Sequence, residues 1–158
     1  MAIYMKFGAI EGGVTTKGFE KWIEVTSFQY GVGRGVGSPA GGGKRESSNP
    51  SVSEISVTKP QDVSSAALYQ DALSGTFNTK VDVSFSSSSK DQVDTFLSYE
   101  LTDCGVSGFS LSSGGDNPIE SLSLNFAKIM MTPSPLDKAG VPQKGSVVTY
   151  DLATLTTS

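Results

Sequence analysis

The chain has 158 residues, a formal net charge of −4, one cysteine and no histidine. This length fits a single domain that needs neither a metal ion nor a disulfide for stability. The acidic balance argues against a nucleic-acid-binding protein, which usually carries a basic surface. Cys104 has no partner for an internal disulfide and no histidine to activate it, so it is predicted to be a small buried side chain.

The N-terminal segment alternates apolar and polar residues over residues 3–9, which predicts a half-buried strand. It contains no basic run followed by a continuous apolar stretch, so no Sec signal peptide is expected. No window of about 18 apolar residues marks a membrane span. Composition alone therefore favours a cytosolic protein without membrane insertion.

The second predicted strand covers residues 22–30, and its apolar residues change parity part-way. The first ones mark one face, whereas Phe28 and Tyr30 fall on the opposite face. Either both faces of this strand are covered, or a β-bulge near Ser27 resets the register. The bulge is the favoured interpretation. It turns Phe28 and Tyr30 toward the core and leaves Ser27 and Gln29 facing away from it.

Residues 31–50 (GVGRGVGSPAGGGKRESSNP) are expected to form a long flexible loop. Structureless loops of this length usually serve a function or are disordered. The spaced glycines at its start lack the βαβ context of a dinucleotide site, and Gly43-Lys44 is followed by Arg45 instead of the Ser or Thr of a P-loop. The loop presents a small basic group, Arg34, Lys44 and Arg45, that could meet an acidic surface, including another copy of this chain.

One helix is predicted over about residues 64–74. Asp62 and Ser64 are expected to cap its first N–H groups, and a glycine follows its last turn, where a left-handed residue often ends a helix. Tyr69 and Leu73 share a face at i, i+4 spacing, and ordinary packing is expected for both.

The other predicted elements are strands. They lie around residues 53–59, 81–85, 96–112, 119–131 and 148–152. The longest one changes parity at Asp103, which indicates a second bulge. Bulges let long strands bend, so the seven or eight strands and one helix predict a mainly β, antiparallel barrel that is closed or nearly closed.

No residues form a convincing catalytic or metal site. Glu20 and Glu24 lie in one strand, and Asp62 and Asp71 lie near the helix. Helix capping and surface charge explain these carboxylates more simply than a converging pair across a sugar does. The sequence therefore predicts neither an enzyme nor a bound cofactor or metal.

Two segments match one protein family closely: residues 18–30 (GFEKWIEVTSFQY) and residues 118–131 (PIESLSLNFAKIMM). Residues 56–59 (SVTK) and 96–108 (FLSYELTDCGVSG) extend the likeness over nearly the whole chain. In their order and spacing these segments resemble the haemolysin-coregulated protein (Hcp) family, which builds the inner tube of the type VI secretion machine. The loop at 12–17 departs from the acidic-then-histidine pattern of many members, which bears on subunit contacts more than on the fold.

The resemblance implies a flattened β-barrel with one helix, six copies in each ring, and rings stacked into a tube. The implied partners are further copies of the chain, spike and sheath proteins, and small effector proteins carried in the ring lumen. It also implies a protein of the bacterial cytoplasm that is secreted without a Sec signal peptide when the machine fires. The chain stops soon after its last predicted strand, so no fused toxin domain is expected.

Two groups of residues are therefore candidate sites. In the family the strand that corresponds to residues 22–30 lines the channel, so Gln29 and Ser27 are the expected lumen and effector-binding residues. The alternative is that Gln29 is a solvated residue outside the ring. Arg34, Lys44 and Arg45 are the expected ring-stacking residues. Two other functions remain open: a monomeric adhesion or carbohydrate-binding β-domain, and a phage tail-tube subunit.

Overall fold

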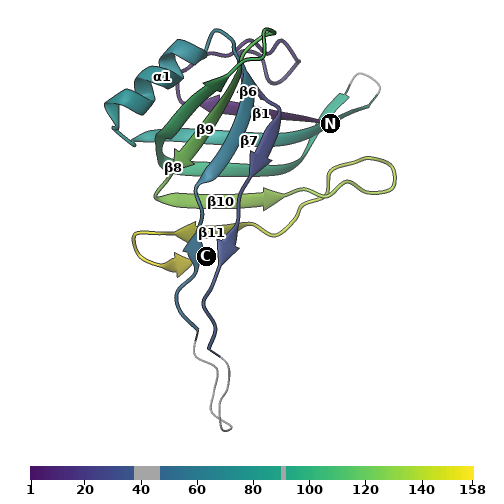
Figure 1. Cartoon of the computed structure of the whole chain (residues 1–158). Coiled ribbons are helices and arrows are strands. Elements are labelled where there is room, and N and C mark those ends of the chain that lie inside the picture. The colour runs from purple at the N-terminus through teal and green to yellow at the C-terminus, as the bar shows by residue number, and fades with distance from the viewer. Residues whose placement is uncertain (38–46, 90–91) are drawn as a thin grey trace.

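The described part of the chain is built mainly from antiparallel strands, with one helix at their edge (Figure 1). The computed structural model describes residues 1–37, 47–89 and 92–158. Within these residues the elements are β1 (Ala2–Phe7), β2 (Ile23–Val25), β3 (Ser27–Gln29), β4 (Val32–Gly33), β5 (Ser51–Val52), β6 (Ile55–Pro60), α1 (Ser65–Ser74), β7 (Thr79–Ser89), β8 (Gln92–Ser112), β9 (Ile119–Asn125), β10 (Lys128–Pro133), β11 (Val148–Asp151) and β12 (Thr156–Thr157).

The strands form two layers. The first layer has the order β12-β11-β10-β8-β7-β1-β2, and the second contains β3, β6, β9 and the later part of β8. Strand β8 belongs to both layers, because its middle pairs with β7 and β10 and its end pairs with β9. The predicted class, a flattened antiparallel barrel with one short helix, is confirmed.

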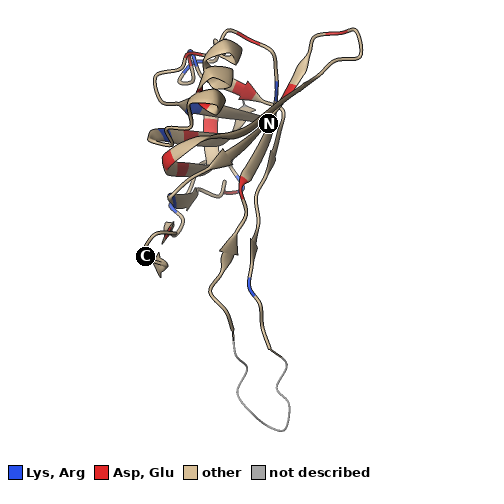
Figure 2. Ribbon diagram, turned by 60° about the vertical axis from the view of Figure 1, so that its left-hand side comes forward, with Lys and Arg blue, Asp and Glu red and all other residues tan. Residues whose placement is uncertain are grey.

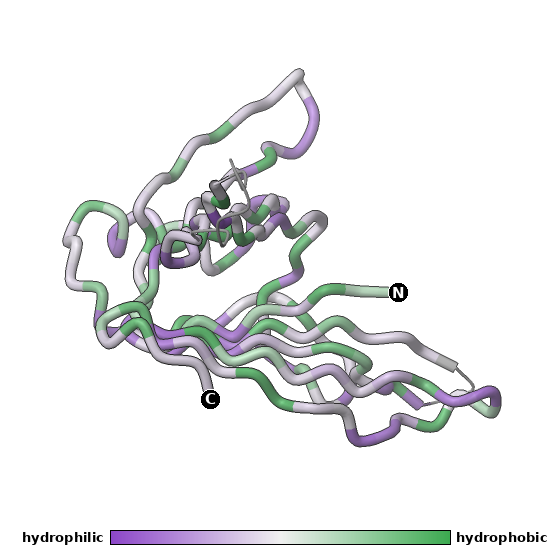
Figure 3. Tube along the Cα trace, turned by 90° about the horizontal axis from the view of Figure 1, so that it is seen from below, coloured by the Kyte–Doolittle hydropathy of each residue, from purple (hydrophilic) through white to green (hydrophobic). Residues whose placement is uncertain are grey.

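The described strands number twelve instead of the predicted seven or eight. Two segments that were expected to be single strands are each divided between the layers: β2 and β3 come from one, and β9 and β10 from the other. Between the layers lies an apolar core. Seen from below, hydrophobic and hydrophilic residues alternate along the strands, as a period of two requires (Figure 3). The core includes Met5, Phe7, Ile23, Ile55, Val57, Leu68, Val81, Val83, Leu101, Cys104, Leu122 and Leu124.

The change of parity after β2 has a different cause from the one predicted. β2 pairs with β1 in the first layer, whereas β3 pairs with β6 in the second, so the chain crosses between layers at Thr26. The proposed bulge is therefore wrong, but its consequence is correct. Phe28 and Tyr30 pack against the core, while Ser27 and Gln29 are exposed.

The second predicted bulge is confirmed. Thr79 pairs with Cys104 and Val81 with Leu101, so two residues of β8 oppose one residue of β7. Asp103 lies in this bulge with φ of 51°, a left-handed conformation that aspartate adopts more readily than most residues. The pairing of β8 shifts register at two further places, between Phe85 and Ser86 of its partner β7 and, in its pairing with β9, between Val106 and Gly108. They let one strand of 21 residues bend from the first layer into the second.

Helix α1 agrees with its prediction in position and in its end, but less well in its cap and packing. Gly75 ends it with φ of 64°. The Asp62 carboxylate accepts the Ser64 N–H at 2.9 Å, whereas the Ser64 side chain makes no capping hydrogen bond. The expected packing is confirmed for Tyr69, whose ring lies 5.3 Å from that of Phe109, whereas the Leu73 side chain is 70% exposed. The helix buries only Leu68 fully.

The segment predicted as a long loop begins and ends as a β-ribbon that extends away from the layers (Figures 1 and 2). We call residues 31–37 and 47–53 the arm. Its strands β4 and β5 pair through Val32 and Val52, and the Ser48 N–H donates to the Gly35 carbonyl at 2.8 Å. The arm's described residues are therefore ordered by backbone pairing.

Candidate functional site

The outer surface of the second layer is lined by two rows of small or polar residues across the strands, most of which bear a hydroxyl. In the first row, Ser27 of β3, Thr58 of β6, Ser121 of β9 and Ser110 of β8 are paired in register. The second row runs from Gln29 through Ser56 and Ser123 to Gly108. We call these residues the hydroxyl face.

The alternation of β6 and β9 places these side chains outside. In β6 the intervening residues Ile55, Val57 and Lys59 are at most 1% exposed. In β9 the intervening Leu122 and Leu124 are equally buried. Because successive side chains of a strand point to opposite sides, the small polar residues between them must face outward.

The hydroxyl face carries no ionisable side chain in either row. The hydroxyls of Ser27 and Thr58 are hydrogen-bonded to each other across β3 and β6. Beside the rows, the Ser107 hydroxyl is within hydrogen-bonding distance of the Ser123 carbonyl, at 3.1 Å, and of the Glu54 carboxylate. The two rows offer neutral donors and acceptors to water or to a polar partner.

The predicted lumen residues are both part of this face. Ser27 and Gln29 are exposed, and behind them Phe28 lies against Phe85 and Tyr99, with ring centroids 5.1 and 5.3 Å away. The aromatic cluster fixes β3 from the inside, so its two polar side chains cannot rotate into the core.

Of the three predicted stacking residues, the structure describes one. Arg34 is exposed on the arm, and it is the only charged residue of residues 31–37 and 47–53 (Figure 2). Lys44 and Arg45 lie outside the described residues. The remaining charges of the described chain lie mostly on the two layers and their loops (Figure 2).

A buried charged cluster was not predicted. The Lys59 Nζ lies 2.6 Å from Glu120 Oε1 and 3.1 Å from Asp62 Oδ1, and it donates to the Pro60 carbonyl at 2.9 Å. The side chains of Lys59 and Glu120 are 0% and 1% exposed. Ser65, the first residue of α1, donates to the same Glu120 oxygen at 2.9 Å. The cluster thus ties the start of the helix to β6 and β9.

The described residues contain no group of three or more His, Cys, Asp or Glu side chains that could hold a metal ion. Burial, and to a smaller extent the nearby Asp71 carboxylate, raise the pKa of the Cys104 thiol to about 12. This thiol is therefore protonated and unreactive at neutral pH, as its predicted burial implies. In the same part of the chain, no helix is long and apolar enough to cross a membrane.

The sequence profile of the family described as "Type VI secretion system effector, Hcp" matches residues 4–132. The chain belongs to the Hcp family. Among curated proteins, none matches the sequence. The resemblance found in residues 18–30 and 118–131 is therefore confirmed by a match over most of the chain.

Solved structures of secretion proteins share the Hcp fold of this chain. One, titled "Structure of a type six secretion system protein", has 25% sequence identity and a TM-score of 0.91 over 99% of both chains. Hcp1 from Salmonella typhimurium has 18% identity and a TM-score of 0.75, covering 99% of this chain and 98% of its own. A type VI secretion system effector from Yersinia pestis has 18% identity and a TM-score of 0.72, covering 94% and 98%. The last two likenesses concern the fold.

Sequence reasoning identified two residues of the hydroxyl face and missed the others. The signal was present in the segments ISVTKP and ESLSLN, where a Ser or Thr stands at every second position between aliphatic residues. Neither segment reveals which strand lies beside it. The rows become visible only when the pairing of β3, β6, β9 and β8 is known.

Proposed function

We propose that this chain is a ring-forming structural subunit of the inner tube of a type VI secretion system. Family membership carries the proposal, since the Hcp profile covers residues 4–132. A head-to-tail contact between identical copies closes into a ring when its rotation is right, and rings then stack along their axis. The subunit is made in the bacterial cytoplasm and is exported with the spike by the contracting sheath, without a Sec signal peptide.

In this proposal the hydroxyl face lines the channel of the ring. Neither row of the face carries an ionisable side chain, and its side chains already hydrogen-bond one another in part, as Ser27 and Thr58 do. Small effector proteins in the lumen would meet weak neutral hydrogen bonds instead of fixed charges. Cargo can then be retained during transport and released when the ring leaves the tube.

Labelling of Gln29 tests the placement of the hydroxyl face. A Gln29→Cys variant is coupled to an electron-dense maleimide and its rings are imaged end-on. Because Cys104 is buried, with its pKa raised to about 12, the label reacts at the new thiol. We expect added density inside the channel. The matched control is Gln70→Cys on the exposed face of α1, for which density outside the channel is expected.

Density at the periphery of the ring for Gln29→Cys would show that the hydroxyl face is not the channel wall. Density in the channel for both variants would show that the label does not report position. Neither result would bear on whether rings form, because ring formation is measured separately from the mass of the assembly.

We further propose that the arm stacks one ring on the next. The arm extends beyond the layers, and its described part carries Arg34, whereas the whole chain is acidic. Replacing residues 34–50 with a short Gly-Ser link keeps the paired residues of β4 and β5 and should leave single rings intact while abolishing stacked rings and secretion. Shortening a surface loop costs little stability. Stacked rings of normal length in this variant would contradict the role of the arm.

A further inference from the structure

One carboxylate lies beside the second row of the hydroxyl face. Glu54 directly precedes β6, and the next residue, Ile55, is fully buried, so the Glu54 side chain points outward like that of Ser56. The hydroxyl of Ser107 on β8 is within hydrogen-bonding distance of the Glu54 carboxylate. Strand β9 lies between β6 and β8, so this contact crosses β9 and places the carboxylate over the outer surface of the second layer.

The Glu54 carboxylate supplies a charge that the strands themselves do not present. Within the described residues, the outward-facing positions of β3, β6, β9 and the end of β8 are serine, threonine, glutamine, asparagine, glycine, proline and isoleucine. Lys59 and Glu120 belong to the same strands but face inward, where they are buried and paired with each other. A charge at the border of an otherwise neutral surface favours partners of the opposite sign there.

The structure provides a hydroxyl group for the Glu54 carboxylate but no cation. In the part of the chain that is described, the ion pairs of the lysine side chains involve other carboxylates, and none includes Glu54. The residue is exposed, and its contact with Ser107 leaves most acceptor positions of the two oxygens open. A carboxylate held in this way is suited to bind a lysine ammonium or an arginine guanidinium of a partner.

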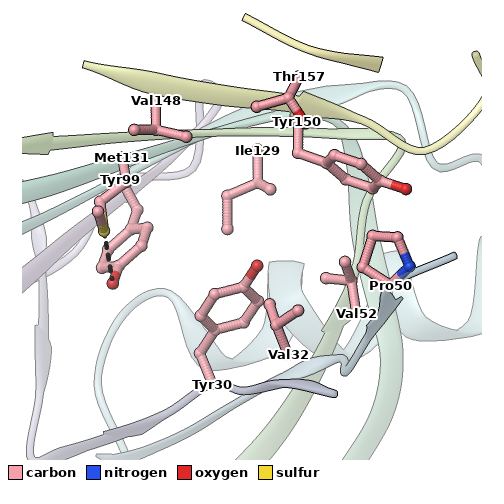
Figure 4. Close-up of a pocket in the computed structure, with 10 residues that line it drawn as sticks. All are labelled: Tyr30, Val32, Pro50, Val52, Tyr99, Ile129, Met131, Val148, Tyr150 and Thr157. Atoms are coloured by element: carbon pink, nitrogen blue, oxygen red, sulfur yellow. Dashed lines mark hydrogen bonds between the residues drawn. The ribbon is translucent and has the colours of Figure 1, made fainter. Parts of the chain in front are cut away.

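The cavity at the base of the arm offers no such counter-charge. Side chains of the arm and of the first layer point toward each other around a volume of about 300 Å³ (Figure 4). The residues that line it, among them Tyr30, Val52, Ile129 and Tyr150, include no aspartate or glutamate. A lysine or arginine would lose its hydration there without gaining an ion pair. Of these two surfaces, the hydroxyl face is the one that fits a cationic partner.

We propose that Glu54 contributes, once per subunit, to a ring of carboxylates at the arm-side end of the channel, and that this ring binds a cationic segment of a cargo protein. Glu54 lies at the end of β6 next to the arm, whereas α1 follows the other end (Figure 1). Along the two rows the cargo still meets neutral groups. The inference rests on the proposed function, because ring closure repeats the residue around one axis. It adds the chemical class of the cargo contact, which family membership does not specify.

A cationic peptide tests the proposal. The probe is a fluorescent peptide of alternating alanine and lysine, and a peptide of alternating alanine and glutamine is the neutral reference; binding to the assembled protein is followed by anisotropy at low salt. Glu54→Gln removes the charge but keeps an acceptor for the Ser107 hydroxyl, so the mass of the rings should be unchanged. Because several copies contact one peptide, we expect its affinity to fall at least about tenfold. Added salt should weaken binding to the unaltered rings.

Glu24→Gln is the matched control. It removes an equal charge from an exposed residue of β2, which pairs with β1 in the first layer. If only the total charge of the assembly mattered, this change would weaken binding as much as Glu54→Gln does. We expect the control to bind the lysine peptide within about twofold of the unaltered chain.

The outcomes separate this inference from the proposed function. Rings of normal mass in which Glu54→Gln binds the lysine peptide as tightly as the unaltered chain does would overturn the carboxylate ring and leave the tube function standing. An equal loss in Glu24→Gln would also overturn it, since total charge would then explain the binding. Unaltered rings that bind the lysine and glutamine peptides alike at low salt would overturn it as well. A chain that stays monomeric would refute both proposals.

Discussion

Removal of the Lys59 ammonium should strongly destabilise the fold. Lys59→Met leaves the Glu120 carboxylate 1% exposed without its counter-ion, which lies 2.6 Å away in the native cluster. Breaking a buried ion pair on one side typically costs about 3–5 kcal/mol, because an uncompensated charge remains. That is a large part of the roughly 5–15 kcal/mol that stabilises a typical domain. Asp62 also loses its 3.1 Å contact, so the loss belongs at the upper end of this range.

Two companion variants give this prediction its contrast. Lys80 and Glu100 form a 3.6 Å pair with side chains 62% and 35% exposed, so Lys80→Met should cost no more than about 1 kcal/mol. The double change Lys59→Met with Glu120→Leu removes both buried charges and should recover much of the loss. Urea unfolding by circular dichroism gives the free energies, with all chains at one concentration because self-association shifts apparent stability. A Lys59→Met loss no larger than that of Lys80→Met would refute the reasoning.

Two further predictions concern tight packing and the buried thiol. A Cβ at Gly12 would lie 2.3 Å from the Trp22 carbonyl oxygen, so Gly12→Ala should lower the free energy of unfolding in urea by about 1–3 kcal/mol. A Cβ at Gly13 meets nothing within 4 Å, so Gly13→Ala should change it by no more than about 0.5 kcal/mol. Equal losses in the two variants would contradict the contact at Gly12. With its pKa raised to about 12, Cys104 should react with a maleimide at pH 7 only after denaturation, and fast labelling of the native chain would contradict its burial.

Local signals predicted what depends on neighbouring residues. The helix was placed within one residue because Asp62 and Gly75 mark its two ends. The bulge at Asp103 was predicted from a parity change, since a period of two cannot otherwise be kept along one strand. Both features are determined by a few adjacent side chains and backbone angles.

Long-range pairing is what the sequence could not provide. The parity change before Phe28 was interpreted as a bulge, because nothing local tells a bulge from a crossing between layers. Nothing local links Lys59 to its partner Glu120, which lies 61 positions away. Tyr69 and Leu73 have ordinary i, i+4 spacing, but the helix sits at the edge of the layers and turns only Leu68 fully inward.

The central claim is that copies of this chain close into a ring. Light scattering coupled to size exclusion, at micromolar chain concentration, measures the mass of the assembly directly. The account predicts a discrete species of about six times the 16.5 kDa chain, with a central channel in images of the same fraction. A species that stays at the mass of one chain over the whole concentration range would contradict it.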